Sequence, residues 1–229
     1  MSESSTKQMK QNTLLRWLHP KKPNLAIDHN NKYIYIHVPK TAGTSIRKAL
    51  QTTSWPYVSQ GTRYRIPKHA TALQIKEIVG DRNWQSHFTF AFVRNPWDLM
   101  VSSYHWWLRK GNRYESTRNM AKLVEQCGSF DSFIKSELGS NYVNEFKSPG
   151  LKEWYCDENN RILVDFIGRF ETIADDFQHI GECLKVKVPE LPYMNTSDRS
   201  PYRKYYNDET YQAVANRFAW TIEHFGYEF

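Results

Sequence analysis

Short apolar runs alternate along the chain with stretches in which apolar residues recur at helical spacing. Aromatic and β-branched residues dominate residues 33–38 and 87–93, and a third apolar run covers residues 161–168. Continuous apolar runs of this length predict strands that are buried on both faces of a sheet. Because each run precedes a segment with helical spacing, the pattern predicts an α/β fold with a mostly parallel central sheet flanked by helices.

The segments between these strands carry the signals of helix ends. A helix is expected from about residue 44, directly after the first strand. Another follows Thr71, which makes a capping-box pattern with Gln74, and Gly80 is expected to end it. A third is expected to begin with Pro96 at its first position, where proline is favoured.

The last third of the chain predicts two more helices. In one of them, apolar residues recur on a single face from Ile173 to Leu184. The other is expected to run as one helix from about Asp208 to a glycine stop at Gly226. Ligands of such sheets bind at the carboxyl ends of the strands, so the chemistry is expected in the loops there.

Length and composition fit one folded domain. The chain has 229 residues, of which 40 % are hydrophobic, and this is enough for a sizeable core. Residues 1–30 are polar and then rich in proline and asparagine, which predicts an N-terminal tail or extension. Residues 31–229 are therefore expected to form a single domain.

The charge balance favours an anionic ligand. Lys and Arg number 31 against 24 Asp and Glu, which gives a net charge of +7. The basic residues are dispersed rather than clustered, so no nucleic-acid partner is expected. No apolar run approaches the ~20 residues of a membrane span, and the N-terminus lacks the apolar core of a signal peptide. The sequence therefore predicts a cytoplasmic protein without a membrane partner.

The cysteines suggest neither a redox centre nor a metal site. Cys127, Cys156 and Cys183 are widely spaced and match no known motif. We therefore expect reduced thiols and no metal. The oligomeric state is not indicated by the sequence.

Residues 39–45, with the sequence PKTAGTS, form the turn between the first strand and its helix. A helix N-terminus offers unpaired N–H groups and partial positive charge, which together bind anions. Lys40 adds a full charge, and Gly43 permits close approach of the backbone. The hydroxyls of Thr44 and Ser45 add two donors. An ordinary strand-to-helix turn capped by Thr44 has the same composition, and it stays open as an alternative at this point.

The spacing in this turn differs from that of nucleotide triphosphatases. Their loop, G-x-x-x-x-G-K-[ST], places lysine directly before the hydroxyl residue that binds Mg²⁺. Here Lys40 stands four residues before Thr44, and no glycine precedes it at the required spacing. A Mg²⁺-dependent nucleotide kinase or hydrolase is therefore disfavoured, although it remains an alternative.

A second candidate anion site follows the strand at residues 87–93. Arg94 stands at the end of this strand, at the same edge of a parallel sheet as the first turn. On the helix after it, an apolar stripe is expected to face the core: Trp97, Met100, Val101, Tyr104, Trp107 and Leu108. At 100° per residue, Ser102, Trp106 and Arg109 fall on the opposite side.

The outward-facing Ser102 has two interpretations, because it either faces solvent or joins Arg94 in binding a second phosphate. Two anion sites at adjacent strand ends, without a Mg²⁺ motif, indicate a nucleotide with two separated phosphates. The segments HVPKTAGTSI, residues 37–46, and FVRNPWDLMVSSY, residues 92–104, closely resemble the sulfotransferases that use 3′-phosphoadenylyl sulfate (PAPS). The resemblance covers residues 33–229 and points to the branch with carbohydrate sulfotransferases and small bacterial relatives.

The resemblance implies a P-loop-like sulfotransferase fold, PAPS as donor, adenosine 3′,5′-bisphosphate (PAP) as product, and no metal. In the family the first loop holds the 5′-phosphosulfate, and an arginine with a serine eight residues later holds the 3′-phosphate. A late basic loop closes over the nucleotide, so Arg199 and Ser200 are candidates for the 3′-phosphate side, with a solvated loop as the alternative. The other implied nucleotide-binding residues are Pro39, Lys40, Thr41, Ala42, Gly43, Thr44, Ser45, Arg94 and Ser102.

Sulfuryl transfer needs a base for the acceptor and charge relief on the leaving phosphate. His69 is the candidate base, because imidazole takes a proton near pH 7 and because the family's base occupies a similar place. A purely structural loop histidine is the alternative, and His37, inside a predicted strand, is expected to pack. Lys40 is the candidate group at the leaving oxygen, carried over from the family's loop.

The sequence therefore predicts a sulfotransferase that moves a sulfuryl group from PAPS to a hydroxyl or amine by in-line transfer. The acceptor is expected to be a glycan or another small molecule. A protein that binds PAP or PAPS without catalysis remains an alternative. Trp97 is expected in the core rather than against the adenine ring.

Overall fold

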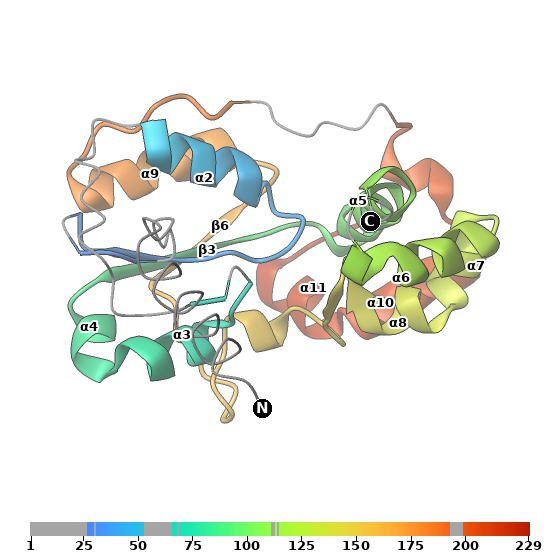
Figure 1. Ribbon diagram of the computed structural model, residues 1–229, viewed down its shortest axis with the longest axis horizontal. Coiled ribbons are helices and arrows are strands. Elements are labelled where there is room, and N and C mark those ends of the chain that lie inside the picture. Colours follow the sequence, from blue (N-terminus) through green and yellow to red (C-terminus); the bar gives the residue numbers. More distant parts are fainter. Residues whose placement is uncertain are drawn as a thin grey trace, which may run out of the picture.

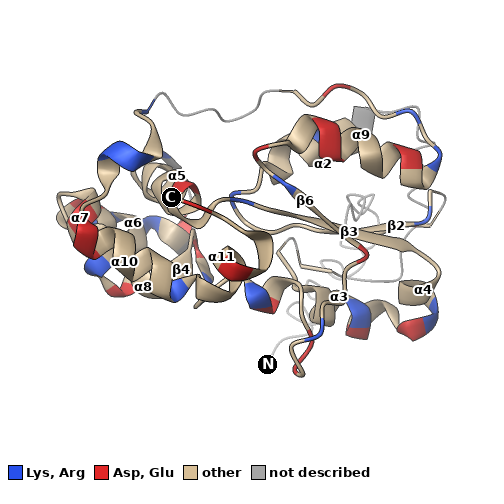
Figure 2. Ribbon diagram, turned by 180° about the vertical axis from the view of Figure 1, so that it is seen from behind, with Lys and Arg blue, Asp and Glu red and all other residues tan. Residues whose placement is uncertain are grey.

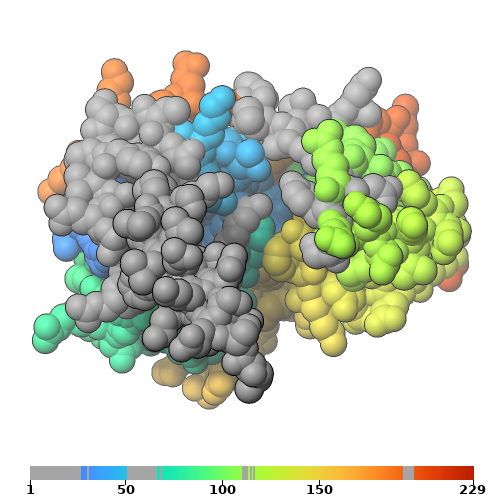
Figure 3. All heavy atoms as spheres, viewed as in Figure 1, coloured from blue at the N-terminus to red at the C-terminus, as the bar shows by residue number. Residues whose placement is uncertain are grey.

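The computed structural model describes residues 27–29, 31–52, 66–67, 69–110, 113, 115–192 and 199–229. Residues 1–26, most of the expected N-terminal tail, lie outside these described residues. In Figure 1 the described part forms two neighbouring regions, a sheet with helices on both faces and a group of helices at one end of that sheet. Figure 3 shows the second region in green and yellow beside the blue helix of the first.

The central sheet has four strands: β1 (Ile27–Asp28), β2 (Tyr33–Ile36), β3 (Phe88–Val93) and β6 (Phe166–Arg169). Their order in the sheet is β1-β2-β3-β6. The last three run parallel, and β1 is antiparallel to β2. The carboxyl ends of β2 and β3 therefore lie at the same edge, and the prediction of a mostly parallel sheet is confirmed.

Helices cover both faces of this sheet (Figure 1). On one face lie α2 (Gly43–Thr52) and α9 (Ile173–Leu184), and on the other lie α3 (Ala72–Val79) and α4 (Asp81–Gln85). Side chains alternate along each strand, so the two faces pack into two separate hydrophobic cores. This is the flanked α/β sheet that the sequence predicts.

Several predicted helix ends are confirmed. Thr71 and Gln74 form the reciprocal capping box at the start of α3, and Gly80, with φ of 80°, follows its last residue. Pro96 is the first residue of α5 (Pro96–Lys110). Each of these ends is a local property of the sequence, which explains why it was predictable.

The second region is built mainly from helices. Its elements are α5, α6 (Glu115–Gln126), α7 (Phe130–Lys135), α8 (Glu137–Asn141), β4 (Tyr142–Val143), β5 (Phe146–Lys147), η2 (Lys152–Trp154), η3 (Tyr202–Tyr205), α10 (Asp208–Arg217) and α11 (Ala219–Phe225). The apolar stripe of α5 packs into the hydrophobic core that these helices share with one face of the sheet, as expected. Trp97 is 2 % exposed and stacks on Tyr211 with ring centroids 5.4 Å apart, so it packs in the core rather than facing a ligand.

The prediction of a strand over residues 161–168 is wrong in extent. Regular pairing begins only at Phe166 and ends at Arg169. Just before it, the Asp165 carboxylate accepts hydrogen bonds from the N–H and the hydroxyl of Thr89, each at 2.8 Å. Hydrogen bonds to side chains thus satisfy backbone groups where hydrogen bonds between strands were expected. The pattern of apolar residues does not reveal this difference.

The prediction of one continuous last helix is also wrong. The chain leaves helical geometry at Phe218 (φ −106°, ψ 21°), between α10 and α11. The break directs Trp220 and Phe225 toward Tyr155, with ring centroids 6.5 and 6.1 Å away. Apolar spacing continues unchanged through the break, so periodicity predicts a single helix. The stop at Gly226, in left-handed geometry, is confirmed.

Charged residues of both signs are spread over the described helices (Figure 2). This agrees with the dispersed charge of the sequence. Among the helices that the structure describes, none is both long enough and apolar enough to span a bilayer.

His87, directly before β3, is 4 % exposed and makes hydrogen bonds at both ring nitrogens. Its Nδ1 lies 2.6 Å from the Asn83 carbonyl oxygen, so this nitrogen carries the proton, and Nε2 accepts from His29 at 3.0 Å. Burial lowers the pKa of His87 below its ordinary value. The folded protein therefore resists protonation of this ring.

We expect the free energy of unfolding to fall as the pH drops from about 7.5 to about 5.5, because the unfolded chain takes up a proton at His87 that the folded protein does not. The loss per pH unit is at most about 1.4 kcal/mol. Urea titrations at both pH values measure it. His87→Gln should reduce the loss, and His179→Gln, at an exposed histidine, should not. An equal loss in all three proteins contradicts the assignment.

Candidate active site

The turn between β2 and α2 has an unusual backbone. Lys40 and Ala42 both adopt left-handed conformations, with φ of 65° and 61°. Such conformations are costly for residues with a side chain, and they recur at functional sites and in anion-binding backbone nests. The hydroxyl of Thr41, between them, donates to the Val38 carbonyl at 2.9 Å and holds the turn in place. These two conformations therefore mark the turn as a candidate functional segment.

Helix α2 presents its N-terminus to the turn. The N–H groups of Ser45 and Ile46 both bond to the Ala42 carbonyl, at 2.8 and 3.2 Å. Gly43 and Thr44, the first two helical residues, have no acceptor within the helix. Their N–H groups and the positive end of the helix dipole are the features by which helix N-termini bind anions.

The space beside Gly43 is filled by another side chain, which the sequence did not reveal. A methyl group at this position would lie 1.8 Å from Nε2 of His37. The His37 ring therefore fills the space that a side chain at position 43 would need. His37 is buried at 8 % exposure, as packing predicts, but it also lines the cavity described below.

The His69 ring is oriented by a backbone group. Its Nδ1 lies 2.9 Å from the carbonyl oxygen of His37. A carbonyl only accepts, so Nδ1 carries the hydrogen, and Nε2 of the neutral ring holds the lone pair. The ring is also held by its neighbours, with centroids 4.3 Å from His37 and 4.2 Å from Phe146. The lone pair on Nε2 makes His69 a candidate proton acceptor.

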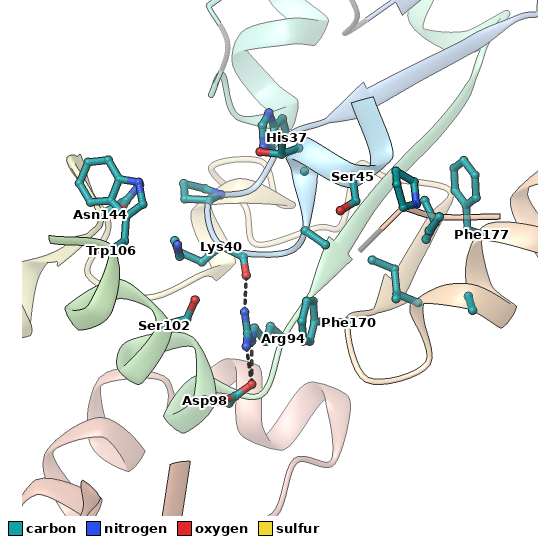
Figure 4. A pocket seen from close by; sticks show the side chains of 18 of the residues that line it. His37, Lys40, Ser45, Arg94, Asp98, Ser102, Trp106, Asn144, Phe170 and Phe177 are labelled. Carbon is teal, nitrogen blue, oxygen red and sulfur yellow. Dashed lines mark hydrogen bonds and ion pairs between the residues drawn. The ribbon is translucent and has the colours of Figure 1, made fainter. Parts of the chain in front are cut away.

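Arg94 lies between the turn and α5 (Figure 4). Its Nε and Nη2 donate to Oδ2 of Asp98 at 2.9 and 2.6 Å, and its Nη1 donates to the Lys40 carbonyl at 2.9 Å. The guanidinium also lies 3.8 Å from the centre of the Phe170 ring. These contacts hold the arginine at the carboxyl end of β3 and tie it directly to the turn.

Asp98 binds a second arginine. Arg199, from the segment before η3, donates to the other carboxylate oxygen of Asp98. Burial alone raises the pKa of Asp98, but the charges of Arg94 and Arg199 outweigh it and hold that pKa below its usual range. The carboxylate is therefore ionised at neutral pH and holds two cations from distant parts of the chain.

One cavity of about 780 Å³ brings most of the predicted residues together. It is lined by the whole turn from Pro39 to Ser45 except Thr41. The other predicted residues that line it are His69, Arg94, Ser102 and Arg199. Ser200 is exposed and does not line it. The volume is that of an ordinary small-molecule site.

The cavity also contains residues that the sequence did not single out. Asp98 lies in the first turn of α5, whereas Arg94 stands before that helix, so the helical spacing rule does not predict their ion pair. Phe170 and Phe177 line the cavity from the α9 side (Figure 4). Asn144 enters it from the segment between α5 and β6, where the sequence carries no clear signal. Trp106 and Arg109, predicted to face away from the core, both line the cavity.

No cluster of three or more His, Cys, Asp or Glu side chains suited to a metal ion occurs in the part of the chain that the structure describes. The expectation of a metal-independent site stays a prediction. It is tested below by binding with and without Mg²⁺.

Comparison with known proteins places the chain in a class. A model of the sulfotransferase family matches residues 23–228, and the chain therefore belongs to the sulfotransferase family. An uncharacterised protein of Archaeoglobus fulgidus is 28 % identical over 137 residues, which is 58 % of this chain and 97 % of that protein. No solved structure gives a significant match. Enzymes of this family transfer sulfuryl groups in general.

Proposed function

We propose that the protein transfers a sulfuryl group from PAPS to a hydroxyl or amine of a glycan or another small molecule. The observation that carries the proposal is that the turn, Arg94, Ser102 and the oriented His69 all line one cavity. The described lining of the cavity carries four cationic side chains, Lys40, Arg94, Arg109 and Arg199, against three carboxylates, Asp98, Asp175 and Glu190. This surplus suits a donor that carries a 5′-phosphosulfate and a 3′-phosphate.

His69 acts as the general base in this proposal. As the acceptor oxygen forms its bond to sulfur, Nε2 takes the acceptor's proton, and the His37 carbonyl stabilises the imidazolium through Nδ1–H. The bond between sulfur and the 5′-phosphate oxygen breaks at the same time. Lys40 and the N–H groups of the turn stabilise the charge on that oxygen, and PAP leaves.

The first test is calorimetric titration with PAP, ADP and ATP, each with and without Mg²⁺. Binding of PAP that does not depend on Mg²⁺ supports the proposal. Binding of ATP only with Mg²⁺ indicates a nucleotide kinase or hydrolase instead. The second test is transfer from ³⁵S-labelled PAPS to N-acetylglucosamine, methyl glucuronide, 4-nitrophenol and tyramine. Tight PAP binding without transfer to any of them supports a nucleotide-binding protein that lacks catalysis.

Arg94→Ala is expected to lower the affinity for PAP at least about tenfold, because charged hydrogen bonds to the 3′-phosphate are lost. ADP has no 3′-phosphate, so its affinity should fall less than that of PAP, by only the amount that the lost hydrogen bond to the Lys40 carbonyl costs the turn. Titration of both nucleotides into both proteins measures the difference. Arg161→Ala, at an exposed arginine that pairs with Asp157 outside the cavity, is the matched control. Equal losses for PAP and ADP contradict the assignment of the 3′-phosphate to Arg94.

A further inference from the structure

Asn144 stands in the two-residue turn of the hairpin formed by β4 and β5. The strands pair Val143 with Phe146, which leaves Asn144 and Glu145 as the loop. Asn144 has φ of 60°, and Glu145 does not share the positive φ. A hairpin loop with positive φ at its first position only favours glycine there. Asparagine adopts positive φ more readily than most residues, so the turn admits it, but the backbone does not require its amide to be buried at the cavity.

The hairpin is fixed between the proposed base and α5. The N–H of Asn144 donates to the buried hydroxyl of Ser103 at 2.9 Å, one residue after Ser102 on α5. The Phe146 ring lies against His69, with centroids 4.2 Å apart. Figure 4 shows Asn144 and Trp106 in the same part of the view, away from Phe170 and Phe177. Asn144 thus belongs to the His69 side of the cavity.

The side chain of Asn144 is buried but incompletely bonded. The residue is 7 % exposed and lines the cavity. Its Oδ1 has no hydrogen-bond partner among the residues that the structure describes. A buried acceptor without a donor costs stability, so such groups in native proteins have a reason. The terminal torsion of asparagine is broad, so the amide is able to rotate to meet a donor group of a bound ligand.

We infer that Asn144 binds the acceptor substrate and orients it for His69, an inference that rests on the proposed function. Oδ1 accepts only, and the phosphate and sulfuryl oxygens of the donor offer it no hydrogen. The donor's adenine amino group and ribose 2′-hydroxyl could donate, and contact with either would show as a loss of PAP affinity in the experiment below. The acceptor carries at least one O–H or N–H, and it must lie against His69 to lose its proton. The reacting hydroxyl or amine, or a neighbouring one, therefore completes the bonding of Asn144.

The variant Asn144→Gly removes the proposed acceptor-binding amide and keeps the backbone conformation of the hairpin turn. Glycine adopts the positive φ without strain, so the hairpin and the contact of Phe146 with His69 should be kept while the amide is removed. Asn160→Gly is the matched control, because Asn160 also has a left-handed backbone, with φ of 64°, but is exposed and lies outside the cavity.

The experiment compares the wild type and both variants by PAP titration and by transfer from ³⁵S-labelled PAPS to the four acceptors named above. We expect Asn144→Gly to keep its affinity for PAP and to lose about tenfold in kcat/KM for the acceptor, mainly through KM. An unchanged kcat/KM overturns the inference and leaves the proposed function in place. A loss of PAP affinity does the same, because it shows that Asn144 contacts the nucleotide instead of the acceptor. PAP binding without transfer by the wild type overturns both.

Discussion

His69→Asn is expected to reduce the rate of sulfuryl transfer by about 10²- to 10⁴-fold, which is the usual contribution of a general base. The asparagine amide reproduces the N–H that His69 donates to the His37 carbonyl, but it has no basic nitrogen. The affinity for PAP should stay within about twofold, since the proposed nucleotide contacts come from the turn, Arg94 and Ser102. Single-turnover transfer from ³⁵S-labelled PAPS and PAP titration measure the two quantities.

The control for this experiment is His224→Asn, at an exposed histidine that stacks on Trp220 and does not line the cavity. It should transfer at the wild-type rate. If His69→Asn also transfers normally, the acceptor's proton goes to another group and His69 is structural. If His69→Asn loses PAP affinity as well as rate, the ring contributes to nucleotide binding rather than to proton transfer alone.

Gly43→Ala is expected to destabilise the protein by about 1–3 kcal/mol and to weaken PAP binding at least about tenfold. The added methyl group would lie 1.8 Å from Nε2 of His37, so either the ring or the turn must move. Moving either disturbs the N–H groups of α2 and the contact between His37 and His69. Urea denaturation and PAP titration measure the two effects.

Gly150→Ala is the control, because a methyl group there meets its nearest atom, the Arg217 carbonyl oxygen, at an ordinary 3.5 Å. The double variant His37→Ala with Gly43→Ala tests the cause directly. With the ring removed, the second methyl group has room, so the double variant should be no less stable than His37→Ala alone. Additive destabilisation shows that the strain at position 43 does not come from His37.

Local signals in the sequence predicted two of the loops that line the cavity. The turn at residues 39–45 follows a buried strand and precedes a helix, and Arg94 stands at the end of the next strand. Parallel strands bring such ends to one edge, and the pairing of β2 with β3 confirms it. The outward face of α5 was equally readable, because helical geometry alone puts Ser102 and Trp106 on the side opposite the core. Both lie in the cavity.

The sequence by itself therefore determined the main parallel strands, the helix ends at Thr71, Gly80, Pro96 and Gly226, and the residues of the turn. The helix ends and the turn depend on neighbours within about one helical turn, and the strands show as continuous apolar runs. Only the tertiary structure decided the contacts between distant segments. The His37 carbonyl accepts a hydrogen bond from His69, the His37 ring fills the space beside Gly43, and Asp98 accepts a hydrogen bond from Arg199. Asn144 reached the cavity in the same way. No periodicity encodes these contacts, because they arise when separate elements pack and buried polar groups must find partners across the fold.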